Sequence, residues 1–514
     1  MRGLALVVLL ACTARAEDTV RASDFGFDPV DATAALQAAL DSGVATVIVD
    51  NRGADWVTRP LIIRRDNLRV VFEPGVVVTA KAGAFPGTSD SLITARGRSN
   101  LVFSGYGATL RMQKAEYTTG EWRMVLNLLS CSHVLIEGLV LRDSGGDGIY
   151  LGNAGGSAQP YCLDVHIRDV TCDNNRRQGI SVISARDLLI EGSLLKNTNG
   201  TAPQAGIDLE PNRATEHLVN CVVRDTRIEN NAGACMAVAT LNQDATSPPL
   251  DVTFENIYCT SRGASSAITY SGVGPASGQA EFRDVLVDGF RSTGVSGYRK
   301  AAYGAAEYRF TNATFRNIGS LPLYFSGTDA GVSEYGGVRF SGTVVHLDRN
   351  TSFLSTAEAA GSQGVANLAG DITVFNPYGA QMRLGAKAHD IHLEVRERRQ
   401  SVASTVSVAA TATGFRITRA SEDLSFPLAV TYEMAGTAVN RQDYAGLPGV
   451  AVIPAGETAV NVTLRTRRRA CDALDVTLTL QESAFYTLSG DSRAETPLPL
   501  PSDCRAWARA RSGK

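Results

Sequence analysis

Apolar and polar residues alternate in short segments along most of this chain, and turns rich in Gly, Asn and Asp separate the segments. Such alternation is typical of β-strands with one buried face. Seven segments align as repeats: NLVFSGYGATL, HVLIEGLVL, DVHIRDVTC, DLLIEGSLL, NCVVRDTRI, DVTFENIYC and AEFRDVLVD. Their matching positions are 33, 31, 23, 33, 31 and 28 residues apart. This irregular period predicts an all-β fold, a right-handed parallel β-helix whose loops vary in length from coil to coil.

The matching positions of the repeats carry alternating charge. They are Ser104, Glu137, Arg168, Glu191, Arg224, Glu255 and Arg283. Strands of successive coils lie about 4.8 Å apart, so these side chains are expected to stack outside the coil as a ladder without like charges in contact. A second column is polar and is expected to satisfy the backbone at a bend. It contains Asp143, Asn174, Asn197, Asn230 and Ser261. We predict a structural role for both ladders.

The segment DATAALQAALDSG precedes the repeats and has apolar residues at helical spacing up to Gly43. It predicts one amphipathic helix that caps the open edge of the first coil. From SDFGFDPVDATAALQAALDSG to LIIRRDNLRVVFEPGVVVTA, the chain resembles the opening of pectate-lyase-like and polygalacturonase-like β-helix proteins. The coil is expected to cover roughly residues 45–395. The resemblance implies a protein that acts on carbohydrate.

The C-terminal part has a different pattern. Its core, TYEMAGTAVNRQDYAGLPGVAVIPAG, resembles a Calx-beta domain, which implies a small β-sandwich. Members of that family often bind calcium in the following loop, but this chain has RTRRRACDALD there. Arg465, Arg467, Arg468 and Arg469 replace most of the expected acids, and Asp472 and Asp475 alone make a poor calcium site. We expect a spacer or adhesion module that requires no metal.

The first residues suggest export. Arg2, the apolar run LALVVLLAC and the small residues Ala14–Ala16 are typical of a signal peptide cut before Glu17. A lipoprotein signal with Cys12 lipidated is the less favoured alternative. The apolar run is too short to span a bilayer. The expected organisation is a signal peptide at 1–16, the β-helix at 17–398, the sandwich at 399–492, and a Pro-rich, then basic tail at 493–514.

Composition changes this picture little. Charged residues make up 20% of the chain and glycine occurs 49 times, which suits an all-β protein. The net charge of −3 gives no indication of a nucleic-acid partner. We therefore expect a secreted protein, periplasmic or extracellular, with no membrane span and with a polysaccharide as its partner. The sequence specifies no oligomeric state.

Cysteine positions suggest both bridges and buried thiols. Cys131 and Cys162 fall in neighbouring coils and are close enough to bridge, and Cys471 with Cys504 can tie the tail to the sandwich. Two further cysteines, Cys172 and Cys259, share a column with Leu195 and Ile228, which predicts buried apolar roles. No spacing resembles a zinc site.

Three phrases, GGDGIYLG, RRQGISVI and QAGIDLEP, stack on one another and on GACMAV in the next coil. Alternation sends one set of residues into the coil, namely Ile149, Ile180, Ile207, Cys235, Leu151, Val182 and Leu209. One outward column contains Tyr150, Ser181, Asp208 and Met236. The next contains Gly152, Ile183, Glu210 and Val238. Only the third phrase therefore places two acids, Asp208 and Glu210, on the same outer face.

Asp208 and Glu210 are the candidate catalytic pair. Positions i and i+2 of a strand lie about 6.5–7 Å apart, near the 6.5–9.5 Å of inverting glycosidases and beyond the 5–5.5 Å of retaining ones. Two close acids push their pKa values apart, which gives one proton donor and one ionised partner. Asp147 is expected to be a third acid. Apolar neighbours in these columns argue against a merely solvated pair.

The neighbours of the pair suit a carbohydrate groove. Tyr150 offers a ring for sugar stacking, and Arg176 and Arg177 offer guanidinium groups for a carboxylate or sulfate on the sugar. Gln178 and Asn212 are expected to bind hydroxyl groups, and the loop TNGTAPQ to form a wall of the groove.

Three functions follow. The favoured one is a glycoside hydrolase that requires no cofactor, although the NTD, GHG and RIK motifs of polygalacturonases are absent. The second is a lyase or C5-epimerase of a uronate polymer, with Arg176 or Arg177 on the carboxylate and Asp208 and Glu210 holding calcium. The phrases GGDGIYLG and NNRRQGISV resemble those of mannuronan C5-epimerases, but the Asp-Pro-His signature is missing. The third is a non-catalytic glycan-binding or adhesion protein.

Overall fold

The computed structural model describes residues 19–272, 276–300, 305–327, 336–358, 364–399, 404–467 and 473–499. The expected signal peptide, with Cys12, lies outside the described residues. So do Arg468, Arg469, Cys471, Asp472 and Cys504.

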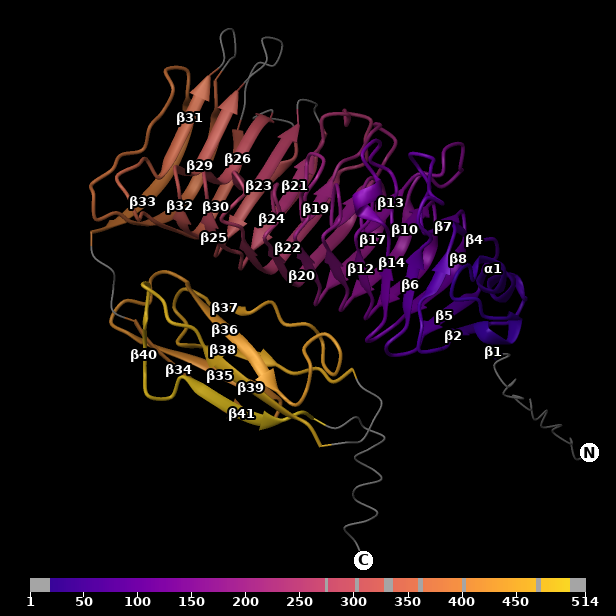
Figure 1. Cartoon of the computed structure of the whole chain (residues 1–514). Coiled ribbons are helices and arrows are strands. Elements are labelled where there is room, and N and C mark those ends of the chain that lie inside the picture. Colours follow the sequence, from indigo (N-terminus) through magenta and orange to yellow (C-terminus); the bar gives the residue numbers. More distant parts are fainter. Residues whose placement is uncertain are drawn as a thin grey trace, which may run out of the picture.

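A long solenoid of stacked strands forms most of the molecule, and a smaller sandwich lies alongside it (Figure 1). The described strands of the solenoid pair in parallel in two sheets, and the predicted right-handed parallel β-helix is confirmed. Sheet A contains β1 Thr19–Arg21, β2 Thr46–Val49, β3 Trp56–Thr58, β5 Leu68–Phe72, β6 Val77–Ala80, β8 Ser99–Ser104, β9 Thr109–Arg111, β11 Ser132–Glu137, β12 Val140–Arg142, β14 Cys162–Arg168, β15 Thr171–Asp173, β17 Ala185–Glu191, β18 Leu194–Lys196, β20 Leu218–Glu229, β22 Leu250–Thr260, β24 Gly278–Arg283, β25 Leu286–Phe290, β27 Glu307–Thr311, β28 Thr314–Ile318, β30 Gly336–His346, β32 Ala366–Phe375 and β33 His389–Arg398.

Sheet B supplies one strand to each coil and faces away from the sandwich (Figure 1). Its strands are β4 Leu61–Ile63, β7 Ile93–Arg96, β10 Leu126–Leu129, β13 Ile149–Gly152, β16 Ile180–Val182, β19 Ile207–Leu209, β21 Met236–Ala239, β23 Ser266–Gly272, β26 Thr293–Lys300, β29 Leu321–Gly327 and β31 Leu354–Glu358. Inward side chains of both sheets form one continuous apolar core.

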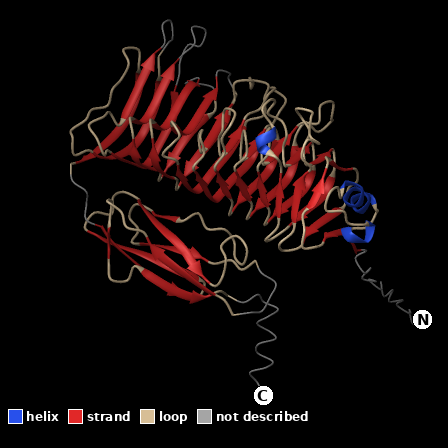
Figure 2. Cartoon of the chain, viewed as in Figure 1, coloured by secondary structure: helices blue, strands red, loops and turns tan. Residues whose placement is uncertain are grey.

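Helices are few in the described residues (Figure 2). They are η1 Ala22–Phe25, α1 Thr33–Asp41 and η2 Lys114–Glu116. The helix α1 buries Leu36 and Leu40 against the first coil, which confirms the predicted cap. None of the helices in the described ranges has the length and apolar character needed to cross a bilayer.

Both predicted ladders of sheet A are confirmed in their register. Glu137 pairs with Ser104 below it and Arg168 above it, and the alternation continues through Glu191, Arg224, Glu255 and Arg283. The Arg168 and Arg224 guanidinium groups each lie 2.6 Å from the glutamate of a neighbouring coil. In the polar column, Asn174 Nδ2 donates to Asp143 Oδ1 at 2.7 Å. The four Asp and Asn residues of that column adopt positive φ angles of 55–58°, which these two residue types tolerate best after glycine.

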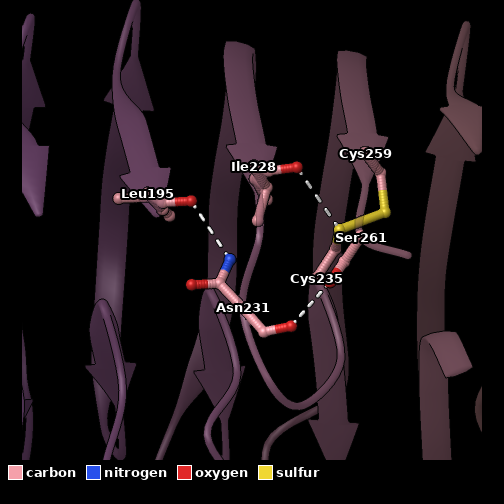
Figure 3. Close-up of a disulfide and its surroundings, with 6 residues drawn as sticks. All are labelled: Leu195, Ile228, Asn231, Cys235, Cys259 and Ser261. Carbon is pink, nitrogen blue, oxygen red and sulfur yellow. Dashed lines mark hydrogen bonds between the residues drawn. A yellow bond between two sulfur atoms is a disulfide. The ribbon is translucent and has the colours of Figure 1, made fainter. Parts of the chain in front are cut away.

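The cysteines depart from expectation in two places. Cys259 lies in the column of Leu195 and Ile228, as predicted, but it forms a disulfide with Cys235 across the coil (Figure 3). Cys131 and Cys162 are free and buried, so the expected bridge between them is wrong. Both thiols point into the core and approach backbone carbonyls: Cys131 Sγ lies 3.5 Å from Ala95 O and Cys162 Sγ 3.5 Å from Leu128 O. Cys172 is buried, as expected.

The sandwich consists of two four-stranded sheets and has its own apolar core. One sheet contains β34 Ser404–Thr411, β35 Gly414–Ser421, β38 Ala459–Thr463 and β40 Thr487–Leu488. The other contains β36 Leu428–Gly436, β37 Val450–Ile453, β39 Asp475–Leu480 and β41 Arg493–Pro497. Because β41 pairs with β39, the sandwich extends past the boundary that we expected at residue 492.

The sandwich docks on the outer face of sheet A. Arg467 Nε lies 2.9 Å from Asp169 Oδ2, and Gly446 N donates to Asp169 Oδ1 at 2.7 Å. Val450 and Val452 pack against Leu286 of the solenoid. Arg467, one of the arginines found in place of the expected calcium ligands, therefore helps to hold the two domains together.

Candidate active site

The outer face of sheet B carries the predicted acids. Tyr150, Ser181 and Asp208 occupy one register position of β13, β16 and β19, and the residues on either side of each point into the core. In the next coil, however, Ala237 pairs with Asp208, so the expected alignment of Met236 with Asp208 is wrong.

Met236 and Val238 are inward residues, only 0% and 1% exposed. The bend of that coil is Cys235, whose carbonyl accepts from Ile207 N, and this shifts the coil by one position from the sequence alignment. The small Ala237 therefore takes the place expected for Met236 beside Asp208, and Val238 is no longer a neighbour of Glu210 in the outward column.

Asp208 lies on the outer face but beneath loops, and it is 2% exposed. Gln178 Nε2 donates to its Oδ2 at 2.8 Å, and Gln178 Oε1 accepts from Ala205 N at 2.8 Å. The Asp208 Oδ1 atom has no hydrogen-bond partner. Burial and then the neighbouring charge of Glu210 raise the pKa of Asp208 well above its usual value. Both effects favour the protonated form of Asp208.

Asp147 is the second buried acid of this face. Its side chain is 0% exposed and neither of its oxygens makes a hydrogen bond of normal geometry, although the Ser181 hydroxyl and Gln178 N–H lie near it. Burial raises the pKa of Asp147 to about 7, against the opposing effect of Arg177. Two oxygens without partners in a buried carboxyl are unusual for a group with a purely structural role.

Arg177 is the cation at the centre of the cluster. Its Nη2 lies 3.2 Å from Glu210 Oε2, its Nε 3.1 Å from Glu121 Oε2, and its Nη1 3.9 Å from Asp147 Oδ2. The Arg177 side chain is 13% exposed, whereas those of Glu210 and Glu121 are 35% and 34% exposed. The guanidinium thus separates two buried acids from two carboxylates that face solvent.

Asp208 and Glu210 differ in exposure although they are only two positions apart. The carboxyl of Asp208 is buried, whereas the side chain of Glu210 is 35% exposed. The charge of Glu210 is among the causes that raise the pKa of Asp208. The pair therefore consists of one buried and one accessible acid, rather than two exposed carboxyl groups on opposite sides of a bond.

The other predicted residues divide into two groups. Tyr150 is half-buried beside the acids, and burial and then Asp147 raise its pKa. Arg176 lies apart, because its guanidinium donates to the carbonyls of Thr118 and Gly120. Asn212 is exposed, and its backbone N–H donates to Glu216 Oε2 at 2.6 Å. The structure brings Asp147, Tyr150, Arg177, Gln178, Asp208 and Glu210 together, and leaves out the side chains of Arg176 and Asn212.

Two acids near the cluster escaped the sequence reasoning. Glu121 contacts Arg177 from a loop that no repeat covers, so its position had no counterpart in neighbouring coils. Glu216 is 3% exposed, lies close enough to influence the Tyr150 hydroxyl, and has a pKa raised mainly by burial. In the described part of the chain, no group of three or more His, Cys, Asp or Glu side chains is arranged to hold a metal ion.

A cavity of about 350 Å³ lies elsewhere, between sheet A and the sandwich. Its charged lining includes Arg224, Glu255 and Arg465. Glu255, the ladder glutamate named here, is paired with Arg283. We place the candidate site at Asp208 because the unpaired acids are there.

Comparison with known proteins supports the fold. Residues 123–272 match the family model described as "Right handed beta helix region". An uncharacterized protein of Bacillus subtilis, YclG, is 27% identical over 163 residues, which are 29% of this chain and 27% of that protein. The chain thus spans about a quarter of the length of the curated relative it matches.

Two solved structures from Azotobacter vinelandii are similar in fold. The A-module of mannuronan C-5 epimerase AlgE4 is 16% identical with a TM-score of 0.51, and the match covers 74% of this chain and 100% of the module. The A-module of AlgE6 is 14% identical with a TM-score of 0.52, over 74% and 99% of the two chains. At these identities the likeness shows a shared solenoid.

Proposed function

We propose that this protein is a secreted, polysaccharide-active enzyme that hydrolyses glycosidic bonds at the cluster around Arg177. The observation that carries the proposal is a buried carboxyl with an unpartnered oxygen, Asp208, two positions from a carboxylate, Glu210, that is ion-paired with Arg177 and faces solvent. Glycoside hydrolysis requires one carboxyl that donates a proton and one that remains ionised.

The exposure of each group suggests its role. Glu210 is 35% exposed and can reach a bound sugar, so we assign it the role of proton donor. Asp208 and Asp147 are too deeply buried to touch a substrate and are positioning residues for Arg177 and Glu210. Gln178 fixes the Asp208 carboxyl through its hydrogen bond, and Tyr150 lies beside Asp147.

Hydrolysis fits the cluster better than the lyase or epimerase reaction. Those reactions need a free cation for the uronate carboxylate, and Arg177 already faces Glu210, Glu121 and Asp147. Arg176 is bound to backbone carbonyls. A glycan-binding protein would not need buried acids with unpartnered oxygens beside its binding surface.

The remaining parts of the proposal concern location and the second domain. The signal-like first residues support export, and the fold neighbours include enzymes named for a polysaccharide, mannuronan. We propose that the sandwich is a Calx-beta-like spacer. Its Arg467 contacts the solenoid, which supports a structural role for this domain.

A polysaccharide screen with matched variants tests the proposal. Asp208→Asn and Glu210→Gln are compared with wild type and with Asp251→Asn, an exposed acid of β22 outside the cluster. New reducing ends indicate hydrolysis, ultraviolet absorbance of an unsaturated uronate indicates a lyase, and retention without cleavage indicates a binding protein. We expect new reducing ends, a loss of about 100-fold to 10,000-fold in Glu210→Gln, and no loss in Asp251→Asn. Full turnover by Glu210→Gln would exclude the proposed site.

A further inference from the structure

The loop before β10, residues 117–123, lies against the acidic cluster and is fixed at both ends. Arg176 donates to the carbonyls of Thr118 and Gly120. Arg123 is 5% exposed and donates to Phe85 O at 3.0 Å, Thr119 O at 2.6 Å and Pro86 O at 3.2 Å. Two arginines bound to backbone carbonyls give this loop one defined conformation.

The clamped loop presents Glu121 and Trp122 to solvent, next to the exposed Thr118 and Thr119. Trp122 is 47% exposed, although a ring of this size is normally largely buried. Glu121 shares the Arg177 guanidinium with Glu210, at 3.1 Å and 3.2 Å from its nitrogens. The two carboxylates therefore flank one cation on the exposed side of the cluster.

We propose that this loop completes the active site: Glu121 is the second catalytic carboxylate, and Trp122 is a platform on which an uncharged sugar ring stacks. This inference rests on the proposed hydrolase function and assigns its missing base and its substrate class.

The roles of Glu210 and Glu121 account for both proton transfers of the reaction. Glu210 passes its proton to the glycosidic oxygen as the bond from C1 to that oxygen breaks. Glu121 accepts a proton from the water molecule whose oxygen forms the new bond to C1. The leaving sugar keeps the first proton, and exchange with solvent moves the second from Glu121 back to Glu210.

The charge of the site selects the substrate class. Glu121 and Glu210 both face solvent, and the one guanidinium between them is already shared. A uronate carboxylate at this position would add a third negative charge near one cation, which is unfavourable at these short distances. An uncharged ring adds no charge, and its apolar face can stack on the Trp122 indole.

Variants of the loop test the roles of its residues. Glu121→Gln is expected to lower kcat about 100-fold or more, with KM nearly unchanged, and to remove the acidic limb of the kcat profile. Trp122→Ala is expected to raise KM about tenfold, and Trp122→Phe to restore most of the loss. Glu116→Gln is the matched control, because Glu116 lies just before the loop and accepts from Gly83 N, away from the cluster. Melting curves show whether each variant is folded.

Matched substrates test the substrate class. Native uronate polymers, the same polymers after chemical reduction of their carboxyl groups, and neutral polysaccharides are supplied to the full chain. Cleavage of neutral or reduced polymers alone supports the inference. Faster cleavage of any native uronate polymer than of its reduced form would overturn the substrate class.

The outcomes separate this inference from the proposed function. If Glu121→Gln keeps full turnover while Glu210→Gln loses it, the hydrolase stands and the role of Glu121 is wrong. If no polymer is cleaved, the proposed function fails, and with it the role of Glu121. Retention of neutral glycans that Trp122→Ala abolishes would still support the platform, and no retention would overturn it.

Discussion

The two outer faces of the solenoid are both rich in charge but arranged in opposite ways. On sheet A each ladder glutamate has an arginine in the adjacent coil, and on sheet B one arginine serves four acids. Although burial opposes it, the Arg168 and Ser104 side chains lower the pKa of Glu137. Burial without such partners raises the pKa of Asp147 and Asp208. Glutamates paired with arginine stabilise the coil, whereas buried acids without such a partner need another explanation.

The comparison separates structural acids from functional ones without any appeal to motif. The buried ladder acids have a cation within hydrogen-bonding distance, as in the 2.6 Å contact of Arg224 with Glu191. The buried acids of sheet B keep oxygens with no partner at all. Such groups lower stability, so their presence favours a role in catalysis.

Arg177→Met should have the largest effect. Removing the cation leaves Glu210 and Glu121 repelling each other beside Asp147, which should cost about 3–5 kcal/mol of stability at neutral pH. Turnover should also fall by at least about 100-fold, because Glu210 and Glu121 lose the cation that positions both carboxylates. Unfolding by denaturant and reducing-end assays measure the two effects. In the ladder control, Arg168→Met, stability should fall while turnover stays at the wild-type level; equal losses of turnover would remove the distinction between the faces.

Asp147→Asn should have the next largest effect, and it should be stabilising. A carboxyl whose pKa rises from 3.8 to about 7 on folding destabilises the native state above pH 7 and costs nothing below about pH 4. The shift corresponds to at most about 4 kcal/mol. Asp147→Asn should therefore exceed wild type in stability above pH 7, and the difference should vanish as the pH falls towards 4.

Glu137→Gln should change stability in the opposite direction to Asp147→Asn. Because the pKa of Glu137 is lowered in the folded state, its ion pair stabilises the protein at neutral pH and the contribution is lost on acidification. The variant should be less stable than wild type at neutral pH and should approach it in acid. Parallel pH dependence of the two variants would contradict our account of both faces.

The same contrast explains what could be predicted from sequence. The ladder of Glu137, Arg168 and Glu191 was predictable because each residue has a counterpart in the next coil at a regular register. Asp208 was placed on the correct face for the same reason. Glu121 was not predictable, since it lies in a loop between coils and reaches Arg177 only in three dimensions. Met236 was misplaced because the alignment took Cys235 as the first inward residue of its strand, whereas it occupies the bend.

Arg467→Met should have an intermediate effect, on docking of the sandwich to sheet A. The Asp169 side chain is 0% exposed, and this change leaves it with Tyr106 and a backbone N–H as partners. Losing a charged hydrogen bond costs about 2 kcal/mol. Small-angle scattering should then report a more extended molecule, whereas Arg416→Met, an exposed arginine of β35, should leave the dimensions unchanged.

The smallest effect should come from the last rung of the ladder. Arg283 Nη1 lies 3.8 Å from Glu255 Oε1, and the two side chains are 41% and 38% exposed. A double-mutant cycle of Glu255→Gln and Arg283→Met should therefore give a coupling energy below about 0.5 kcal/mol that disappears at high salt. The corresponding cycle for Glu137 and Arg168, whose glutamate is 8% exposed, should give a larger energy that salt changes little. Equal coupling at the two rungs would mean that burial does not govern the strength of these ion pairs, and the same reasoning would then fail for the unpaired acids of sheet B.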